Sequence, residues 1–402
     1  MSLLDKLSDP NCWERFYEYK TSLVSKKSFT AELRSFIDGK GYLPVCGRIS
    51  SGESFPLPRR SEISKQETGK KRVIYIYPPA ENTVLKLLTH LMLRKYDGCF
   101  AGGLYSFRPN HTAQMAVRKL TRTPGIGSMW AYKADISNYF NSVDISLLMP
   151  MLEKTLGNDR ELYGFLSSLL TEPCVLDDGR RITEQKGIMA GTPISAFCAN
   201  LYLSELDRRF EALGVPYARY SDDIIVFSED RDKLDEYKEL VHSFLREKGL
   251  TVNPDKELLS APGEGWVFLG LSYKDGIIDI APASVVKLKA KMRRKTRALM
   301  RWQQRSGISP EKAAKAFIRI FERKLFGGNE DNDLTWSYWY FPVINTDRSL
   351  RVIDRYAQDC IRYLISGKRT ASRFNVRYED MKQLGLRSLV HEYYSRLETE
   401  DP

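Results

Sequence analysis

The sequence has few residues of the kinds that bind transition metals. It contains only four histidines, with neither an H-E-x-x-H motif nor a Cys/His cluster, and its six cysteines include no C-x-x-C pair. A zinc site is therefore not expected, and the wide spacing of the cysteines predicts reduced thiols. Any metal should be bound through oxygen, which favours Mg²⁺ with Mn²⁺ as the alternative.

Long apolar runs are also absent. The N-terminal segment MSLLDKLSDP is interrupted by charge within five residues, and no stretch approaches the roughly 18 apolar residues of a membrane span. We therefore expect a cytoplasmic protein without a membrane partner. Biased tracts are missing too, and 42% hydrophobic with 28% charged residues excludes a disordered chain. A length of 402 residues allows two or three packed units.

What the chain has in excess is positive charge. Its net charge of +11 and pI near 9.2 favour a polyanionic partner, nucleic acid before anionic membrane. Residues 285–305 hold nine basic residues and no acidic one. Their helical spacing predicts a stripe that follows a phosphate backbone, although a solvated face is the alternative. The predicted RNA contacts are Lys291, Arg294, Arg297 and Arg301.

Strand and helix patterns alternate up to about residue 280, and helical patterns dominate afterwards. We expect a hairpin around residues 62–77, a strand over 128–136, one long helix over 195–213 and a second hairpin over 217–228. The fold class is therefore α+β. Three segments are predicted: an N-terminal extension (1–60), an αβ-rich unit (61–280) and a helical C-terminal region (281–402).

Acidic residues at two strand ends suggest a metal site. Asp222 and Asp223 form the turn of the predicted hairpin over 217–228, and Asp135 ends the strand over 128–136. Each alone is an ordinary turn residue, because Asp favours turns. Together they suit two-metal nucleotidyl transfer, which uses ions about 3.5–4 Å apart bridged by carboxylates from separate strands. The carbonyl oxygen of Ile136 is a candidate extra ligand.

Six short sequence blocks follow one another along the chain in an order that can be compared with known families. They are Leu104-Tyr105-Ser106-Phe107-Arg108-Pro109; Asp135-Ile136-Ser137-Asn138-Tyr139-Phe140; Gly191-Thr192-Pro193-Ile194-Ser195 leading into Ala199-Asn200-Leu201-Tyr202-Leu203; Tyr220-Ser221-Asp222-Asp223; Gly249-Leu250 with Asn253 and Lys256; and Phe268-Leu269-Gly270. Over about residues 60–275 this series resembles bacterial reverse transcriptases of the group II intron and retron type. The resemblance implies a right-hand polymerase whose fingers and palm occupy 61–280 and whose thumb lies in 281–402.

The resemblance also implies roles for particular residues. Asp135, Asp222 and Asp223 would be the catalytic metal-binding carboxylates, and Phe140 would exclude the ribose 2′-hydroxyl, so the substrates would be dNTPs. Further dNTP contacts would come from Lys65, Arg72 and Gly191, and the primer grip from Phe268, Leu269 and Gly270. Lys256 would protonate the leaving pyrophosphate or be an ordinary surface lysine.

Three differences from the usual motifs of intron and retron enzymes narrow the choice of subfamily. The block that usually reads Pro-Gln-Gly is Met189-Ala190-Gly191 here, which removes the glutamine contact to template and dNTP. No C-terminal Cys/His endonuclease follows, and the Val-Thr-Gly signature of retron enzymes is missing. What remains resembles the stand-alone, defence-associated bacterial reverse transcriptases of the unknown groups.

The function expected from this resemblance is RNA-directed DNA synthesis in antiphage defence. A structured noncoding RNA would be the partner and template, dNTPs the substrates and cDNA the product. Two alternatives stay open: template-independent, protein-primed DNA synthesis, and an inactive RNA-binding scaffold. The three carboxylates argue against the scaffold. The sequence leaves the oligomeric state open.

Overall fold

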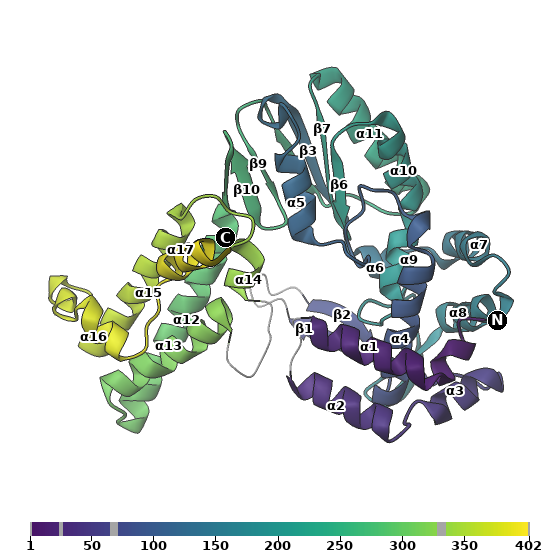
Figure 1. The fold of residues 1–402 in the computed structure, drawn as a ribbon, viewed down its shortest axis with the longest axis horizontal. Coiled ribbons are helices and arrows are strands. Elements are labelled where there is room, and N and C mark those ends of the chain that lie inside the picture. Colours follow the sequence, from purple (N-terminus) through teal and green to yellow (C-terminus); the bar gives the residue numbers. More distant parts are fainter. Residues whose placement is uncertain (1, 24–26, 65–70, 328–334, 401–402) are drawn as a thin grey trace. The chain divides into compact units, whose positions relative to one another are not determined.

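The computed structural model of the protein describes residues 2–23, 27–64, 71–327 and 335–400. The chain forms two compact units, the first of which runs to Pro262 while the second begins at Gly263 (Figure 1). Residues 2–23 and 28–60 belong to the first unit. The predicted boundary near 280 lies inside the second unit, between a strand that ends at Ile280 and a helix that begins at Pro282.

The first unit is built mainly from helices around one hydrophobic core. This core includes Trp13, Leu88 and Phe197, none of which has an exposed side chain. The helices are η1 (Asp5–Ser8), α1 (Pro10–Ser22), α2 (Lys27–Asp38), α3 (Leu43–Ser50), α4 (Pro79–Lys95), η2 (Asp97–Cys99), α5 (Ala113–Thr121), η3 (Ile126–Ser128), α6 (Tyr139–Ser142), α7 (Ile145–Leu156), α8 (Arg160–Thr171), α9 (Ser195–Tyr202), α10 (Ser204–Leu213), α11 (Arg231–Glu247) and η4 (Pro254–Lys256).

One helix prediction is wrong. The sequence pattern predicts a single helix over 195–213, but the structure has α9 and α10, separated at Leu203. Leu203 has φ −104° and ψ 6°, outside the α-helical region, while its side chain stays fully buried. Because apolar residues continue on both sides of the break, their periodicity gives no sign of it.

One sheet of the first unit consists of β1 (Arg59–Ser64), β2 (Lys71–Ile76), β4 (Cys174–Asp177) and β5 (Arg180–Thr183), in the order β2-β1-β4-β5. The antiparallel pairing of β1 with β2 confirms the expected hairpin strands. Strand β1 also pairs with β4 in parallel, so this sheet is mixed rather than purely antiparallel.

The second sheet of the first unit is antiparallel and carries the carboxylates of interest. It contains β3 (Trp130–Asp135), β6 (Tyr217–Tyr220), β7 (Asp223–Ser228) and β8 (Leu258–Ser260), in the order β6-β7-β3-β8. The predicted strand over 128–136 and the hairpin over 217–228 are confirmed as β3 and as β6 with β7. Helix α11 packs on β3 and β7 (Figure 1), and the Asp230 carboxylate starts this helix by accepting hydrogen bonds from two backbone N–H groups.

The second unit joins a small antiparallel sheet to a group of helices. Its strands are β9 (Trp266–Phe268), β10 (Leu271–Lys274) and β11 (Ile277–Ile280); its helices are α12 (Pro282–Ser306), α13 (Pro310–Phe326), α14 (Trp336–Tyr340), α15 (Arg348–Ser366), η5 (Ala371–Asn375), α16 (Tyr378–Gln383) and α17 (Leu389–Glu400). Helix α12 packs against α13 and α15. Its buried residues, Val285, Leu288, Met292, Thr296 and Leu299, recur at helical spacing, so its many basic residues lie on the remaining faces.

None of the helices in the described ranges has the length and apolar character needed to cross a bilayer. All six cysteines are free thiols, and five of them are buried.

Candidate active site

The strand register brings two of the predicted carboxylates together. Strands β3 and β7 are neighbours, and Asp135 lies directly opposite Asp223. Asp222 immediately precedes β7, and its carbonyl oxygen accepts a hydrogen bond from the N–H of Ile136 at 3.0 Å. Three carboxylates, two from the hairpin and one from the adjacent strand, therefore share one end of this sheet.

A buried hydrogen-bond network fixes the turn that carries Asp222 and Asp223. Ser221 has φ +59°, a left-handed conformation that side-chain-bearing residues rarely adopt. Its N–H donates to the hydroxyl of Ser106 at 2.9 Å, and its carbonyl accepts from the guanidinium of Arg219 at 3.1 Å. Ser106 in turn exchanges two hydrogen bonds with Asn200 of α9, at 2.9 and 2.7 Å. These bonds hold a strained turn in one geometry.

The central member of this network is a buried ion pair. The guanidinium of Arg219 donates to both carboxylate oxygens of Asp207, at 2.8 and 2.6 Å, and neither side chain has any exposed surface. Tyr217 donates a further hydrogen bond to Asp207 at 2.7 Å. Paired charges with every strong donor used are the form in which a protein interior tolerates ions. This pair thus connects helix α10 to the turn through β6.

Asp135 is nearly buried, with 5% of its surface exposed. The ammonium of Lys256 lies 2.6 Å from its Oδ2 atom, and the N–H of Asn253 donates to its carbonyl oxygen at 2.7 Å. The carbonyl oxygen of Ile136 accepts no hydrogen bond within the described part of the chain. The block with Asn253 and Lys256 therefore lies beside Asp135, and Lys256 is an exposed lysine that pairs with the Asp135 carboxylate.

The surroundings of Asp222 and Asp223 raise the pKa values of both carboxyl groups. Burial raises the pKa of Asp222, and the charge of Asp135 raises it further. Burial also raises the pKa of Asp223, which Lys133 opposes from 3.4 Å. Carboxylates that repel one another at the end of a sheet favour the binding of cations.

The donor set suits a hard divalent cation, since it consists of carboxylate oxygens and one available carbonyl oxygen. Among the described residues, however, no three His, Cys, Asp or Glu side chains are gathered into a metal-binding group. Lys256 and Lys133 pair with Asp135 and Asp223 in this arrangement. A cation would therefore have to displace the ammonium groups of Lys256 and Lys133, because these carboxylates do not form a preorganised metal site.

One predicted dNTP contact, Arg72, acts electrostatically on Asp222, and another, Gly191, lies against the same strand β2. Arg72 is exposed on β2, and its charge lowers the pKa of Asp222, against the larger effects of burial and of Asp135. Gly191 has φ +100°, and a Cβ atom there would lie 3.1 Å from the carbonyl oxygen of Tyr75 on β2. The N–H of Tyr75 also donates to the carbonyl of Ala190 at 2.8 Å. Strand β2 is therefore attached to the block containing Gly191.

Phe140 follows Asp135 at the start of α6. Its half-buried ring makes edge contacts with Phe107 and Tyr139, at centroid distances of 6.4 and 5.5 Å. Its carbonyl oxygen accepts from the N–H of Ile188 at 2.9 Å, and a Cβ atom on Gly187 would lie 2.4 Å from that oxygen. The ring thus has two aromatic neighbours, and the backbone of Phe140 lies tightly against residues 187–188.

The remaining predicted residues lie either outside the described residues or in the second unit. Lys65 lies outside the described residues. The predicted primer grip belongs to the second unit, where Phe268 ends β9, while Leu269 and Gly270 turn the chain into β10 with φ +51° and +80°. The four predicted RNA contacts lie on α12 of the second unit, where Arg294, Arg297 and Arg301 are exposed and Lys291 is half-buried.

Sequence reasoning missed the residues that position the site. Arg219 could have been noticed as a charge within an apolar strand, but nothing in the sequence identifies Asp207 as its partner. Asn141 was also missed: its amide donates to the carbonyl of Val73 at 3.1 Å and accepts from the N–H of Ala190 at 3.0 Å. It thereby joins β2 to the block that carries Gly191.

Comparison with known families identifies the chain. The family model described as "Reverse transcriptase (RNA-dependent DNA polymerase)" matches residues 63–273, just over half of the sequence. The chain belongs to the reverse transcriptase family. The matched region includes Asp135, Asp222 and Asp223, and the predicted bacterial lineage and α+β fold class are confirmed.

Three relatives illustrate the lineage. The chain is 25% identical to the group II intron-encoded protein LtrA of Lactococcus lactis subsp. cremoris, over 50% of this chain and 33% of that protein. It is 26% identical to the retron Ec86 reverse transcriptase of Escherichia coli, over 42% and 50%, and 23% identical to the E. coli K12 protein YkfC, over 55% and 68%. The match thus spans a third of the intron protein and half of the retron enzyme.

Among solved structures, a telomerase from Candida albicans superposes on 84% of this chain and 67% of its own, with a TM-score of 0.47 and 12% identity.

Proposed function

We propose that this reverse transcriptase family member is an RNA-directed DNA polymerase that extends a primer with dNTPs. The observation that carries the proposal is the placement of Asp135 opposite Asp223 with Asp222 beside them, in a chain of this family. Nucleotidyl transfer requires negative oxygens gathered where the phosphates of the substrate arrive.

The proposed cofactor is Mg²⁺, with Mn²⁺ as a substitute. Asp135, Asp222, Asp223 and the carbonyl of Ile136 would hold it, since they supply the oxygen donors that hard cations prefer. When bound, such ions lower the pKa of an attacking 3′-hydroxyl and neutralise the charge of the leaving pyrophosphate. Arg72 would attract the triphosphate, and the ring of Phe140 would contact the sugar at the place where a ribose 2′-hydroxyl would collide with it.

The proposed template is a structured noncoding RNA that the protein binds chiefly through α12, with cDNA as the product. Support comes from the net charge of +11 and from the exposed guanidinium groups of Arg294, Arg297 and Arg301. The proposed biological role is bacterial antiphage defence, which rests on the resemblance to stand-alone defence-associated enzymes described above.

One observation supports a second candidate function, which is template-independent, protein-primed DNA synthesis. At the position where the block usually has a glutamine, this chain has Ala190. The side chain of Ala190 is buried, and its backbone N–H and C=O both form hydrogen bonds within the protein. Ala190 therefore offers no polar group to a template base. A polymerase of this kind would start DNA on a Tyr or Ser hydroxyl of the protein itself.

The test is a primer-extension assay with the full chain, radiolabelled dNTPs and Mg²⁺ or Mn²⁺, with and without an RNA template. Wild-type extension of a DNA primer on RNA supports the first candidate, while label attached covalently to protein without template supports the second. The paired change Asp222→Asn and Asp223→Asn should reduce either activity at least a thousandfold, whereas the exposed control Asp232→Asn on α11 should not. Equal activity of the paired variant and wild type would exclude this site.

A further inference from the structure

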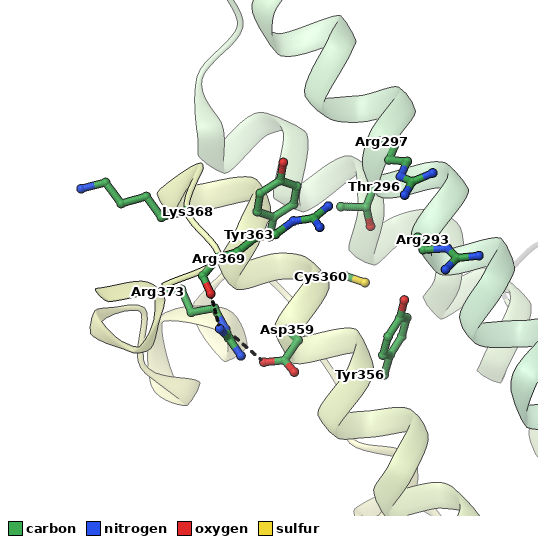
Figure 2. A pocket seen from close by; sticks show the side chains of 10 residues that line it. All are labelled: Arg293, Thr296, Arg297, Tyr356, Asp359, Cys360, Tyr363, Lys368, Arg369 and Arg373. Atoms are coloured by element: carbon green, nitrogen blue, oxygen red, sulfur yellow. Dashed lines mark hydrogen bonds and ion pairs between the residues drawn. The ribbon is translucent and has the colours of Figure 1, made fainter. Parts of the chain in front are cut away.

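A cavity of about 260 Å³ lies wholly inside the second unit, between α12, α15 and the segment that follows α15 (Figure 2). It is distinct from the carboxylate site of the first unit. Figure 2 shows Arg293 and Arg297 on α12, Tyr356 and Tyr363 along α15, and Arg369 near Tyr363. Arg297 belongs both to this cavity and to the face of α12 proposed above to bind RNA.

Local sequence explains how these side chains converge. Arg293 and Arg297 are one helical turn apart, at the border of the buried face of α12. Tyr356 and Tyr363 share one face of α15, seven residues apart. Gly367, with φ +66°, ends α15 and turns the chain. Residues 368–373 can therefore return to the cavity, where Arg373 donates to the carbonyl oxygen of Arg369 at 2.6 Å.

The cavity has a surplus of positive charge. Asp359 is its sole acidic lining residue, and it already pairs with Arg373 at 3.7 Å and with Arg362 at 3.5 Å. Within the described ranges, no carboxylate pairs with Arg293, Arg297 or Arg369. Three guanidinium groups thus face a small cavity without a counter-ion, and an anion there would relieve their repulsion.

Aromatic surface accompanies this charge. The guanidinium of Arg369 lies 5.0 Å from the ring centre of Tyr363, and Lys289 lies 4.8 Å from the ring centre of Tyr356. The side chains of Thr296 and Cys360 close the floor, with 4% and 7% of their surfaces exposed. Burial raises the pKa of Tyr356, and the charges of Arg293, Arg297 and Arg369 oppose this, so all three cations lie near its hydroxyl.

We propose that this cavity binds one 5′-phosphorylated nucleotide, with its phosphate on Arg293, Arg297 and Arg369 and its base against Tyr356 or Tyr363. Guanidinium groups bind phosphate through paired hydrogen bonds, and aromatic side chains stack on bases of any sequence. The volume is slightly below that of typical small-ligand pockets, about 300–1,000 Å³, so it admits a single nucleotide and no duplex. The nucleotide is either free or the 5′ end of a strand. This site does not depend on the proposed polymerase activity.

The first experiment measures binding to the full chain by calorimetry in EDTA, which removes divalent cations from the carboxylate site. The probes are UMP, the trinucleotide pUpUpU and the same trinucleotide with a 5′-hydroxyl. We expect the 5′-phosphate to strengthen trinucleotide binding at least tenfold. Comparable binding of UMP would identify free nucleotides as the ligand, and binding of pUpUpU alone would identify strand ends. Equal binding of both trinucleotides would overturn the proposal, because a general basic surface needs no terminal phosphate.

The second experiment uses matched charge removal. Arg293→Gln with Arg297→Gln should weaken pUpUpU binding at least tenfold, about 1.4 kcal/mol. Lys312→Gln with Arg319→Gln removes the same charge from exposed positions of α13 and should change binding less than threefold. Equal effects of the two pairs would overturn the site.

A measurement on the wild-type protein covers the case in which the cavity variant fails to fold. A pUpUpU probe whose first base is 4-thiouridine is cross-linked by ultraviolet light, and the labelled peptide is found by mass spectrometry. Labelling within residues 356–373 supports the proposal. Labelling confined to other segments overturns it.

Discussion

The buried pair of Arg219 and Asp207 should decide both the stability of the first unit and the geometry of its carboxylate turn. Asp207→Ala leaves a guanidinium fully buried without its counter-charge and removes the acceptor of Tyr217. Breaking a buried pair from one side costs about 3–5 kcal/mol, against a total stability of about 5–15 kcal/mol for a typical protein. The variant should therefore unfold at a much lower urea concentration.

A matched control separates burial from charge. Glu205 and Arg209 form an ion pair on the same helix, α10, at 2.6 Å, but their side chains are 46% and 41% exposed. Glu205→Ala should cost less than about 0.5 kcal/mol, because exposed helical pairs contribute little. Urea denaturation followed by circular dichroism gives both values, provided the dependence of unfolding free energy on urea is unchanged.

A double variant separates stability from positioning. Asp207→Leu with Arg219→Met replaces the pair by apolar side chains and should regain part of the lost stability, as such replacements do elsewhere. It still removes the donor to the carbonyl of Ser221, so the turn carrying Asp222 and Asp223 loses its support. Primer extension should stay low while stability recovers. A cost below about 1 kcal/mol for Asp207→Ala, or full activity of the double variant, would refute this account.

Three further outcomes are expected. Phe140→Ala should reduce discrimination between dATP and ATP at least tenfold in steady-state incorporation on an RNA template; an unchanged ratio would make Phe140 a packing residue. Changing the four predicted contacts on α12 to Gln should make the dependence of log K on log salt shallower by about 3 in filter binding, since each phosphate contributes roughly −0.7 to −0.9; the wild-type slope would place the RNA elsewhere. Burial, together with the charges of Arg94 and Lys20, lowers the pKa of His90 to about 3, so the folded protein keeps this ring neutral while the unfolded chain binds a proton below about 6.5. Stability should consequently fall as pH drops from 7.5 to 5.5, by at most about 1.4 kcal/mol from this residue, and His90→Gln should lack that part of the loss in urea denaturation.

The sequence predicts the strands of the site well because their signals are local. Strand β3 is a β-rich run that ends in Asp135, and β6 and β7 are two β-rich runs on either side of a turn that contains Asp222. The predicted single helix over 195–213 fails for the opposite reason. Leu203, where the helix breaks, is fully buried, and apolar residues continue into both α9 and α10, so the sequence pattern does not mark the break.

The positions of charges around the carboxylates could not be predicted, because they depend on contacts between distant segments. Lys256 and Asp135 are 121 residues apart in the chain but 2.6 Å apart in the fold, and the pairing of Lys133 with Asp223 depends on the register of β3 against β7. Both lysines read as ordinary surface residues in the sequence. In the fold they balance part of a negative charge that burial makes costly. A divalent ion bound by these carboxylates would compete with both ammonium groups for the same oxygens.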